Sequence, residues 1–265
     1  MKLLVQGDDY GFTKGVTYGI IEAIDHGIIT ATGMFTNMPI APWAATFVKE
    51  RPDFCFGIDF NIVSGPPVSD PAEVPHLVDG NGEFIRSKER LKDPRFQSEK
   101  GRREMFPYDE VYKELKAQYD RFVELCGRKP SYLHAHSLGH EHYNEAIQAI
   151  SKETGIPYSM DLWEKYHFGS VLTMPKEVSK VKKEFNAIDQ LNKQPLKNVL
   201  DNSDYLLSCD YAFVGGHPGY VDAELLSLTT LSLERCRDLE MLLSEDFKKW
   251  IEDNHIELIS YKDLK

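Results

Sequence analysis

Histidines gather in one short stretch of the chain. Residues 132–142 hold four of the nine histidines: His134, His136, His140 and His142. Residues 131–136 alternate apolar and polar side chains as a short strand does, which places His134 and His136 on one face. Two imidazoles side by side at a strand end, followed by a loop with two more, have the spacing of a metal site. Such a pair taken alone is also compatible with a loop of solvated histidines, one of which caps the next helix.

Carboxylates and a further histidine follow three other apolar runs. Asp8 and Asp9 come after an apolar run at 3–5, Asp59 lies near the end of 54–60, and His217 follows 211–214. If the backbone stays extended, Asp8 and Asp9 point to opposite sides, so only one of them faces a given metal ion. Taken singly, the aspartates are equally compatible with helix or loop caps, and His217 with a plain turn.

The apolar periodicity predicts strands that alternate with helices. The strands are expected at 3–5, 28–35, 54–60, 131–136, 156–160, 211–214 and 256–259, and the helices at 14–26, 43–49, 108–126, 143–154, 199–207 and 231–251. Residues 62–107 have no long periodic pattern and are interpreted as an excursion over one face. The pattern of residues 161–197 is weak. This alternation predicts a parallel sheet with right-handed crossovers.

The number of strand–helix units favours a distorted, seven-stranded (β/α) barrel formed by a single domain, residues 1–265. A doubly wound open sheet is the alternative α/β architecture. In both architectures ligands bind at the carboxyl ends of the strands. Six residues occupy these strand ends, and their convergence favours a metal site over a loop of solvated histidines. They are Asp8, Asp9, Asp59, His134, His136 and His217.

The bulk composition excludes several classes of protein. The net charge of −11 argues against a nucleic-acid partner, because phosphate binding needs clustered Lys and Arg. The basic residues at 88–103 are mixed with acidic ones and are interpreted as a solvated surface. No apolar run has membrane-spanning length, and the apolar N-terminal run is too short for a signal peptide, so a cytoplasmic protein is expected. The four cysteines form no C-x-x-C pair and are expected to be buried, reduced thiols.

Five motifs, in order and spacing, resemble those of the YdjC-like carbohydrate deacetylases. They are Gly7-Asp8-Asp9-Tyr10-Gly11, Asn37-Met38-Pro39, Phe56-Gly57-Ile58-Asp59-Phe60-Asn61, the stretch 130–140, and Gly216-His217-Pro218-Gly219-Tyr220. The resemblance spans nearly the whole chain and is weakest at 62–107 and 161–197. It implies a barrel of the glycoside hydrolase/deacetylase type. It also implies an enzyme that uses one divalent metal ion to remove the acetyl group from N-acetylated sugars.

The resemblance also implies roles for single residues. Asp8 matches the general base, Asp9 and His136 match metal ligands, and His217 matches the histidine near the leaving group. Two positions depart from the family. Asp59 stands where the family usually has histidine, and His134 where it usually has aspartate. We therefore hypothesise a rearranged site with Asp9, Asp59 and His136 as ligands and His134 close by.

A site rich in carboxylates favours Mg²⁺, with Zn²⁺ and Mn²⁺ as alternatives. The expected substrate contacts are Tyr10, Asn37, Asn61 and Trp163. The substrate expected is a small N-acetylated sugar or chito-oligosaccharide, with or without a phosphate group.

Two alternative functions stay open: a sugar-binding protein that has lost catalysis, and a metal-dependent phosphoesterase, which usually needs more metal ions and histidines. A homodimer is the commonest assembly for such an enzyme.

Overall fold

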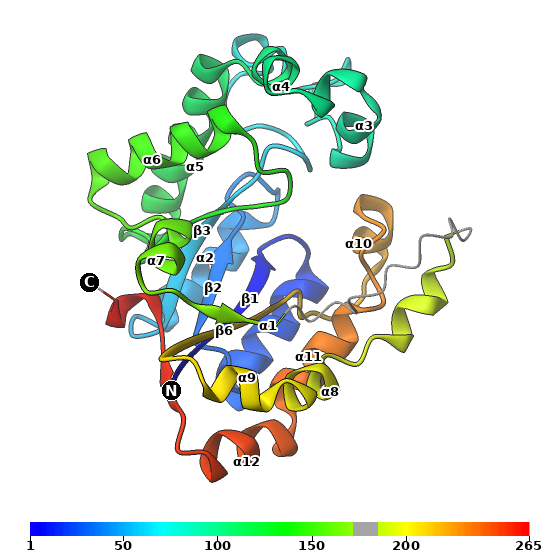
Figure 1. Ribbon diagram of the computed structural model, residues 1–265. Coiled ribbons are helices and arrows are strands. Elements are labelled where there is room, and N and C mark those ends of the chain that lie inside the picture. The colour runs from blue at the N-terminus through cyan, green and yellow to red at the C-terminus, as the bar shows by residue number, and fades with distance from the viewer. Residues whose placement is uncertain (172–184, 265) are drawn as a thin grey trace. The chain divides into compact units, whose positions relative to one another are not determined.

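The chain has a mixed α/β fold built on a parallel sheet. The structure, a computed structural model, describes residues 1–171 and 185–264 (Figure 1). The strands are β1 (Lys2–Tyr10), β2 (Ala31–Met34), β3 (Cys55–Phe60), β4 (Leu133–Ala135), β5 (Gly169–Ser170), β6 (Tyr211–Gly216) and β7 (Glu257–Ile259). Their order is β4-β3-β2-β1-β6-β5, and β7 also pairs with β1. The pairings of β1 with β6 and β7, of β3 with β4 and of β5 with β6 are all parallel. The predicted α/β fold is confirmed, and the described residues form a seven-stranded sheet, although one of its strands, β5, was not among those predicted.

The described chain divides into two compact units, each made of separate segments. The first comprises Met1–Thr32, Asp53–Cys55 and Leu162–Lys265. Its α-helices are α1 (Lys14–His26), α8 (Pro195–Asp201), α9 (Ser203–Leu207), α10 (Ala223–Leu228), α11 (Arg235–Leu243) and α12 (Glu245–Asp253). Its 3₁₀ helices, labelled η, are η3 (Ala187–Asn192) and η4 (Tyr261–Asp263). The apolar side chains at the start of β1 are fully buried, as the continuous run predicted. The side chain of Thr13 caps α1, which ends before Gly27.

The second unit comprises Gly33–Pro52 and Phe56–Asp161. Its helices are α2 (Ala41–Glu50), η1 (Pro71–Glu73), α3 (Ser87–Lys92), η2 (Pro94–Gln97), α4 (Glu99–Met105), α5 (Tyr108–Cys126) and α6 (Glu141–Thr154), and α7 (Ser159–Lys165) begins in it. Helices α5 and α6 both end at a glycine in the left-handed conformation, Gly127 (φ 69°) and Gly155 (φ 73°). The predicted excursion at 62–107 holds η1, α3, η2 and α4, which are too short to give a clear periodic signal. The single domain predicted from the sequence stays a prediction.

Three predicted elements are wrong. The single helix expected at 199–207 is divided at Asn202 into the end of α8 and the whole of α9. A strand was expected at 156–160, but α7 begins at Ser159, and Tyr158 forms only an isolated bridge with Leu133. One long helix was expected at 231–251, but the chain forms α11 and α12. Ser244 separates these two helices with an extended backbone (ψ 130°), and its hydroxyl accepts the N–H of Asp246. A local serine cap therefore outweighs the continuous apolar periodicity.

Other expectations are met in part. The four cysteines are free thiols, but Cys209 and Cys236 are not buried, contrary to the prediction. Within the described ranges, no helix combines the length and the apolar composition needed to cross a membrane. Residues 172–184 of the weakly patterned stretch 161–197 lie outside the described residues.

Candidate functional site

Strands β3 and β4 present an aspartate and two histidines at their carboxyl ends. Asp59 and His134 are register partners on these neighbouring parallel strands, and His136 follows β4 directly. The Asp59 side chain is fully buried. A Cβ atom at Gly33 would lie 2.9 Å from the Cβ of Asp59, so glycine at this position of β2 leaves room for the carboxylate.

Both imidazoles are held by neighbours within the same unit. The Nδ1 atom of His134 lies 2.7 Å from the hydroxyl oxygen of Ser159. This contact fixes the plane of the ring and leaves Nε2 on the opposite side as the atom that can bind a metal ion. The His136 ring packs edge-on against Phe35, with ring centroids 4.7 Å apart, and its backbone N–H donates to the carbonyl of Phe60.

The end of β1 carries the two adjacent aspartates in different environments. Asp9 adopts the left-handed conformation (φ 72°), which aspartate tolerates better than most residues. The backbone at this point is therefore not extended, and Asp8 and Asp9 do not simply alternate across the strand. Asp9 is buried, and its Oδ2 accepts a hydrogen bond of 2.6 Å from Nη2 of Arg235 on α11. The Arg235 side chain is also buried. Asp8 is half-buried and accepts a hydrogen bond of 2.5 Å from Nε2 of Gln6.

The position of His217 is set through its backbone. It follows β6, and its N–H donates to Oδ2 of Asp238 over 2.8 Å. Lys193 donates to the same oxygen over 2.7 Å, and the side chains of Lys193 and Asp238 are both buried. Gly216 provides the space for this carboxylate, since a Cβ atom there would lie 3.1 Å from it. The imidazole of His217 is thus carried on a loop anchored by a buried ion pair.

A pocket of about 340 Å³ lies beside Asp8 and His217 within the first unit. Its lining includes the aromatic side chains of Trp163, Phe168 and Phe213, together with Lys193. The rings of Trp163 and Phe213 pack together with centroids 4.5 Å apart. The predicted substrate contact Trp163 therefore lines the same pocket as the two predicted catalytic residues.

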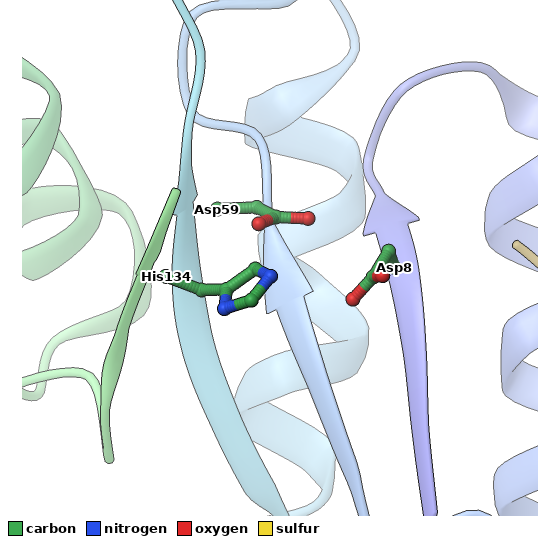
Figure 2. A group of neighbouring side chains, drawn as sticks. All are labelled: Asp8, Asp59 and His134. Atoms are coloured by element: carbon green, nitrogen blue, oxygen red, sulfur yellow. The ribbon is translucent and has the colours of Figure 1, made fainter. Parts of the chain in front are cut away.

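Two sets of side chains have the donor atoms for a metal ion. In one set, Asp8, Asp59 and His134 have ligand atoms that all lie within 4.8 Å of one another, and Figure 2 shows these three side chains. The second set is Asp9, Asp59 and His136, with the same spacing. Asp59 is common to both, so this residue lies at the centre of the arrangement. Two carboxylates and one imidazole form a donor set that divalent cations bind.

The other predicted substrate contacts are buried. Tyr10 and Asn61 are fully buried and Asn37 is nearly so. The Asn61 amide donates to Oδ1 of Asn37 and to the carbonyl of Ser64, and Asn37 donates to the carbonyls of Ser64 and Pro66. These bonds fix the loop that follows β3. A direct contact between any of these three residues and substrate stays a prediction.

The remaining histidines of the 132–142 stretch have structural partners. Nδ1 of His140 accepts the N–H of Tyr143 and so caps α6, while Nδ1 of His142 donates to the carbonyl of Phe106. Burial lowers the pKa of His140 to about 3. The helix-cap interpretation therefore applies to His140, whereas His134 and His136 belong to the metal-donor sets.

Several residues of the site were not predicted from the sequence. Arg235, Lys193 and Asp238 are buried ionic residues from helices or loops far along the chain, and Gln6 precedes the aspartate pair. A buried charge on an amphipathic helix is indistinguishable in sequence from an exposed one. A weak signal existed at Gln6, because a polar residue directly follows the apolar run of β1.

The chain matches known proteins along nearly its whole length. The family model described as YdjC-like protein matches residues 2–253. A carbohydrate deacetylase 2 from Listeria innocua is 33% identical over all of this chain and 99% of its own length. A chitooligosaccharide deacetylase from Yersinia enterocolitica is 29% identical, with 98% of each chain covered.

Two solved structures share the fold. A protein from Enterococcus faecalis, described as acting in cellobiose-phosphate cleavage, superposes with a TM-score of 0.78 at 23% identity, covering 99% of this chain and 98% of its own. A family 4 acetyl xylan esterase from Clostridium thermocellum, solved with a cobalt ion, gives 0.52 at 8% identity, covering 99% and 89%. Because the family model covers nearly the whole sequence and a relative above 30% identity is matched from end to end, the chain belongs to the YdjC-like family.

Proposed function

We propose that this protein is a metal-dependent carbohydrate deacetylase that hydrolyses the N-acetyl group of a small acetylated sugar. The observation that carries the proposal is the gathering of carboxylate and imidazole donors at the strand ends, beside a pocket that holds Asp8 and His217. Membership of the YdjC-like family supports the same chemistry, because relatives matched along their full length are named carbohydrate or chitooligosaccharide deacetylases.

The proposed metal ligands are Asp9, Asp59 and His136, with His134 next to them. The donor set fits a divalent cation, since its two carboxylates suit Mg²⁺ or Mn²⁺ and its imidazole also suits Zn²⁺. We favour Mg²⁺ on the number of carboxylates. A bound ion of this kind polarises an amide carbonyl and lowers the pKa of water. The buried guanidinium of Arg235 offsets part of the negative charge of the site when no ion is bound.

Two side chains of the pocket, Asp8 and His217, carry out the two proton transfers of the reaction. Asp8 acts as the general base that takes a proton from the attacking water, and Gln6 holds its carboxylate through a hydrogen bond to Oδ1. His217 donates a proton to the departing amine, and its loop is kept in place by the bond from its N–H to Asp238. The aromatic wall formed by Trp163 and Phe213 packs against the apolar face of the sugar.

The size of the pocket limits the substrate class. A volume of about 340 Å³ is at the lower end of the range for small-molecule sites, so a sugar residue with its acetamido group fits better than a long polymer. A chito-oligosaccharide, with or without a phosphate group, would place one terminal residue in the pocket. A cytoplasmic location and a homodimer are proposed from the sequence alone.

One observation favours a second candidate, a carbohydrate-binding protein that no longer hydrolyses its ligand. Asp9 is already engaged by a buried arginine, and the two positions that depart from the family pattern are Asp59 and His134. Retention of Asp8 and His217 beside the pocket supports the enzyme over this candidate.

Acetate release tests the proposal. Metal-stripped protein is reloaded in turn with Mg²⁺, Mn²⁺, Zn²⁺ or Co²⁺ and incubated with di-N-acetylchitobiose or its 6-phosphate, with Asp8→Asn as the control. We expect acetate with at least one metal and a loss of at least about 100-fold in the control. Sugar binding without acetate release, on protein that binds metal, would support the second candidate. Release of phosphate instead would indicate the phosphoesterase.

A further inference from the structure

A chain of three hydrogen bonds connects the aromatic wall of the pocket to Asp8. The indole Nε1–H of Trp163 donates to the hydroxyl oxygen of Tyr261 over 2.9 Å. That hydroxyl donates to Oε1 of Gln6 over 2.6 Å, and Nε2 of Gln6 donates to Oδ1 of Asp8 over 2.5 Å. Tyr261 and Gln6 are both about 1% exposed, so water does not compete for these bonds.

The direction of the chain is determined by its two ends. An indole nitrogen can only donate, so the oxygen of Tyr261 accepts from Trp163, and the hydroxyl proton is donated to Oε1 of Gln6. The amide oxygen of Gln6 then faces Tyr261, and its NH₂ group faces Asp8. A carboxylate accepts only, so Asp8 completes the sequence. A flipped Gln6 amide would place its oxygen against the carboxylate of Asp8, so that two acceptors would face each other.

We propose that Tyr261 and Gln6 are positioning residues, which fix Asp8 and Trp163 together through this chain of hydrogen bonds. The inference rests on the proposed deacetylase function, in which Asp8 meets the water and Trp163 meets the sugar. The Tyr261 hydroxyl links the two ends of the chain, because it accepts from Trp163 and donates to the Gln6 amide, which in turn holds Asp8. Tyr261 lies in η4, close to the C-terminal end of the chain, and Gln6 lies in β1.

Three substitutions separate the two arms of the chain. Gln6→Met removes the donor to Asp8 with little change in volume, and we expect kcat to fall about 10-fold or more with KM nearly unchanged. Trp163→Phe removes the donor to Tyr261, and we expect mainly KM to rise. Tyr261→Phe breaks both arms, so kcat should fall and KM should rise together.

Coupling between the residues is tested with the double variant. Because Tyr261 acts on Asp8 only through Gln6, the effect of Tyr261→Phe on kcat should be smaller in the Gln6→Met background than in the wild type. Matched controls lose similar groups elsewhere: Tyr158→Phe removes a hydroxyl bonded to Asn144, and Trp250→Phe removes an indole N–H bonded to Ser203. Both controls should keep kcat and KM. Additive effects of Gln6→Met and Tyr261→Phe on kcat would overturn the proposal.

A spectroscopic measurement gives a result that does not depend on activity. The chain has three tryptophans, so ¹⁵N-indole labelling yields three Nε1–H resonances, which the Trp→Phe variants assign. Tyr261→Phe should shift the Trp163 resonance and leave that of Trp250 in place. An unshifted Trp163 resonance would refute the hydrogen-bond chain itself. If the wild type releases no acetate, the deacetylase proposal fails, while the shift still decides whether the chain of bonds exists.

Discussion

At the scale of single residues, the two adjacent aspartates of β1 have different surroundings and therefore different proposed tasks. Asp9 is buried against Arg235, whereas Asp8 is half-buried, lines the pocket and is held by Gln6. The buried carboxylate of Asp9 is the one that we propose as a metal ligand. A carboxylate at the pocket surface suits a proton acceptor.

This difference gives a prediction on metal affinity. Asp8→Asn should bind Mn²⁺ within a few-fold of the wild type and release almost no acetate, whereas Asp9→Asn should bind the ion on the order of 10- to 100-fold more weakly. Isothermal titration of metal-stripped protein measures both. The reverse pattern, with metal affinity lost in Asp8→Asn, would instead identify Asp8, Asp59 and His134 as the ligand set.

A second prediction at this scale concerns exchanging the aspartate at position 59 with the histidine at position 134. The double variant Asp59→His/His134→Asp introduces the residue types that the resemblance to the family implies at these positions. If Asp9, Asp59 and His136 are the ligands, the donor set gains an imidazole, and the affinity for Zn²⁺ relative to Mg²⁺ should rise on the order of 10-fold or more. Competition titrations with the two ions measure the ratio. An unchanged ratio would mean that positions 59 and 134 both ligate, because the exchange then conserves the donors.

Local sequence pattern predicted some residues of the site and could not predict others. Asp8, Asp59, His134 and His217 follow apolar strand runs, and the ends of parallel strands gather at one edge, so their types and positions indicated a site. Arg235 is separated from Asp9 by 226 positions in sequence. It became recognisable only when the fold buried it, because nothing in a helical pattern distinguishes a buried charge from a solvated one.

At the scale of secondary structure, capping residues explain which elements were predicted well. Strands with continuous apolar runs and helices that end at glycine were found because their signals are local. The division of 231–251 at Ser244 was missed, since the apolar periodicity continues across it. The strand expected at 156–160 was lost because the chain turns into α7 after a single bridging residue.

The cap of α6 leads to a prediction on stability. His140 is buried, stacks on Phe106 with ring centroids 4.0 Å apart, and caps the helix through an unprotonated Nδ1. Burial lowers its pKa from 6.5 to about 3. Because the unfolded chain binds the proton more readily, stability is full above pH 6.5 and declines as the pH falls towards 3. From pH 7 to pH 5 this group alone should cost about 2 kcal/mol of unfolding free energy.

Urea unfolding of His140→Asn at the two pH values measures this contribution. Asparagine also caps helices, so the variant keeps the N-cap bond and loses the titrating ring. Without the stacking on Phe106 it should be less stable than the wild type at pH 7. The difference should narrow by about 2 kcal/mol at pH 5. A difference that stays constant with pH would show that His140 is not held neutral in the folded protein.

At the scale of the whole molecule, the proposed ligands come from segments far apart in sequence, near the N-terminus and in the middle of the chain. An ion bound only by the folded arrangement stabilises it by mass action. At a metal concentration of 100 times Kd this amounts to about 2.7 kcal/mol. For a chain of this size the increase corresponds to a rise in Tm of about 5–10 °C.

Thermal unfolding of metal-stripped protein with and without Mn²⁺ tests this expectation, and Asp59→Asn is the decisive variant. Asp59 belongs to both donor sets, so its replacement should abolish the rise in Tm whichever set holds the ion. His142→Gln is a suitable control, because this histidine lies in the same stretch but bonds to the carbonyl of Phe106. It should keep the full metal-dependent rise. A rise that persists in Asp59→Asn would place the ion elsewhere in the molecule, and the proposed centre would then have to be abandoned.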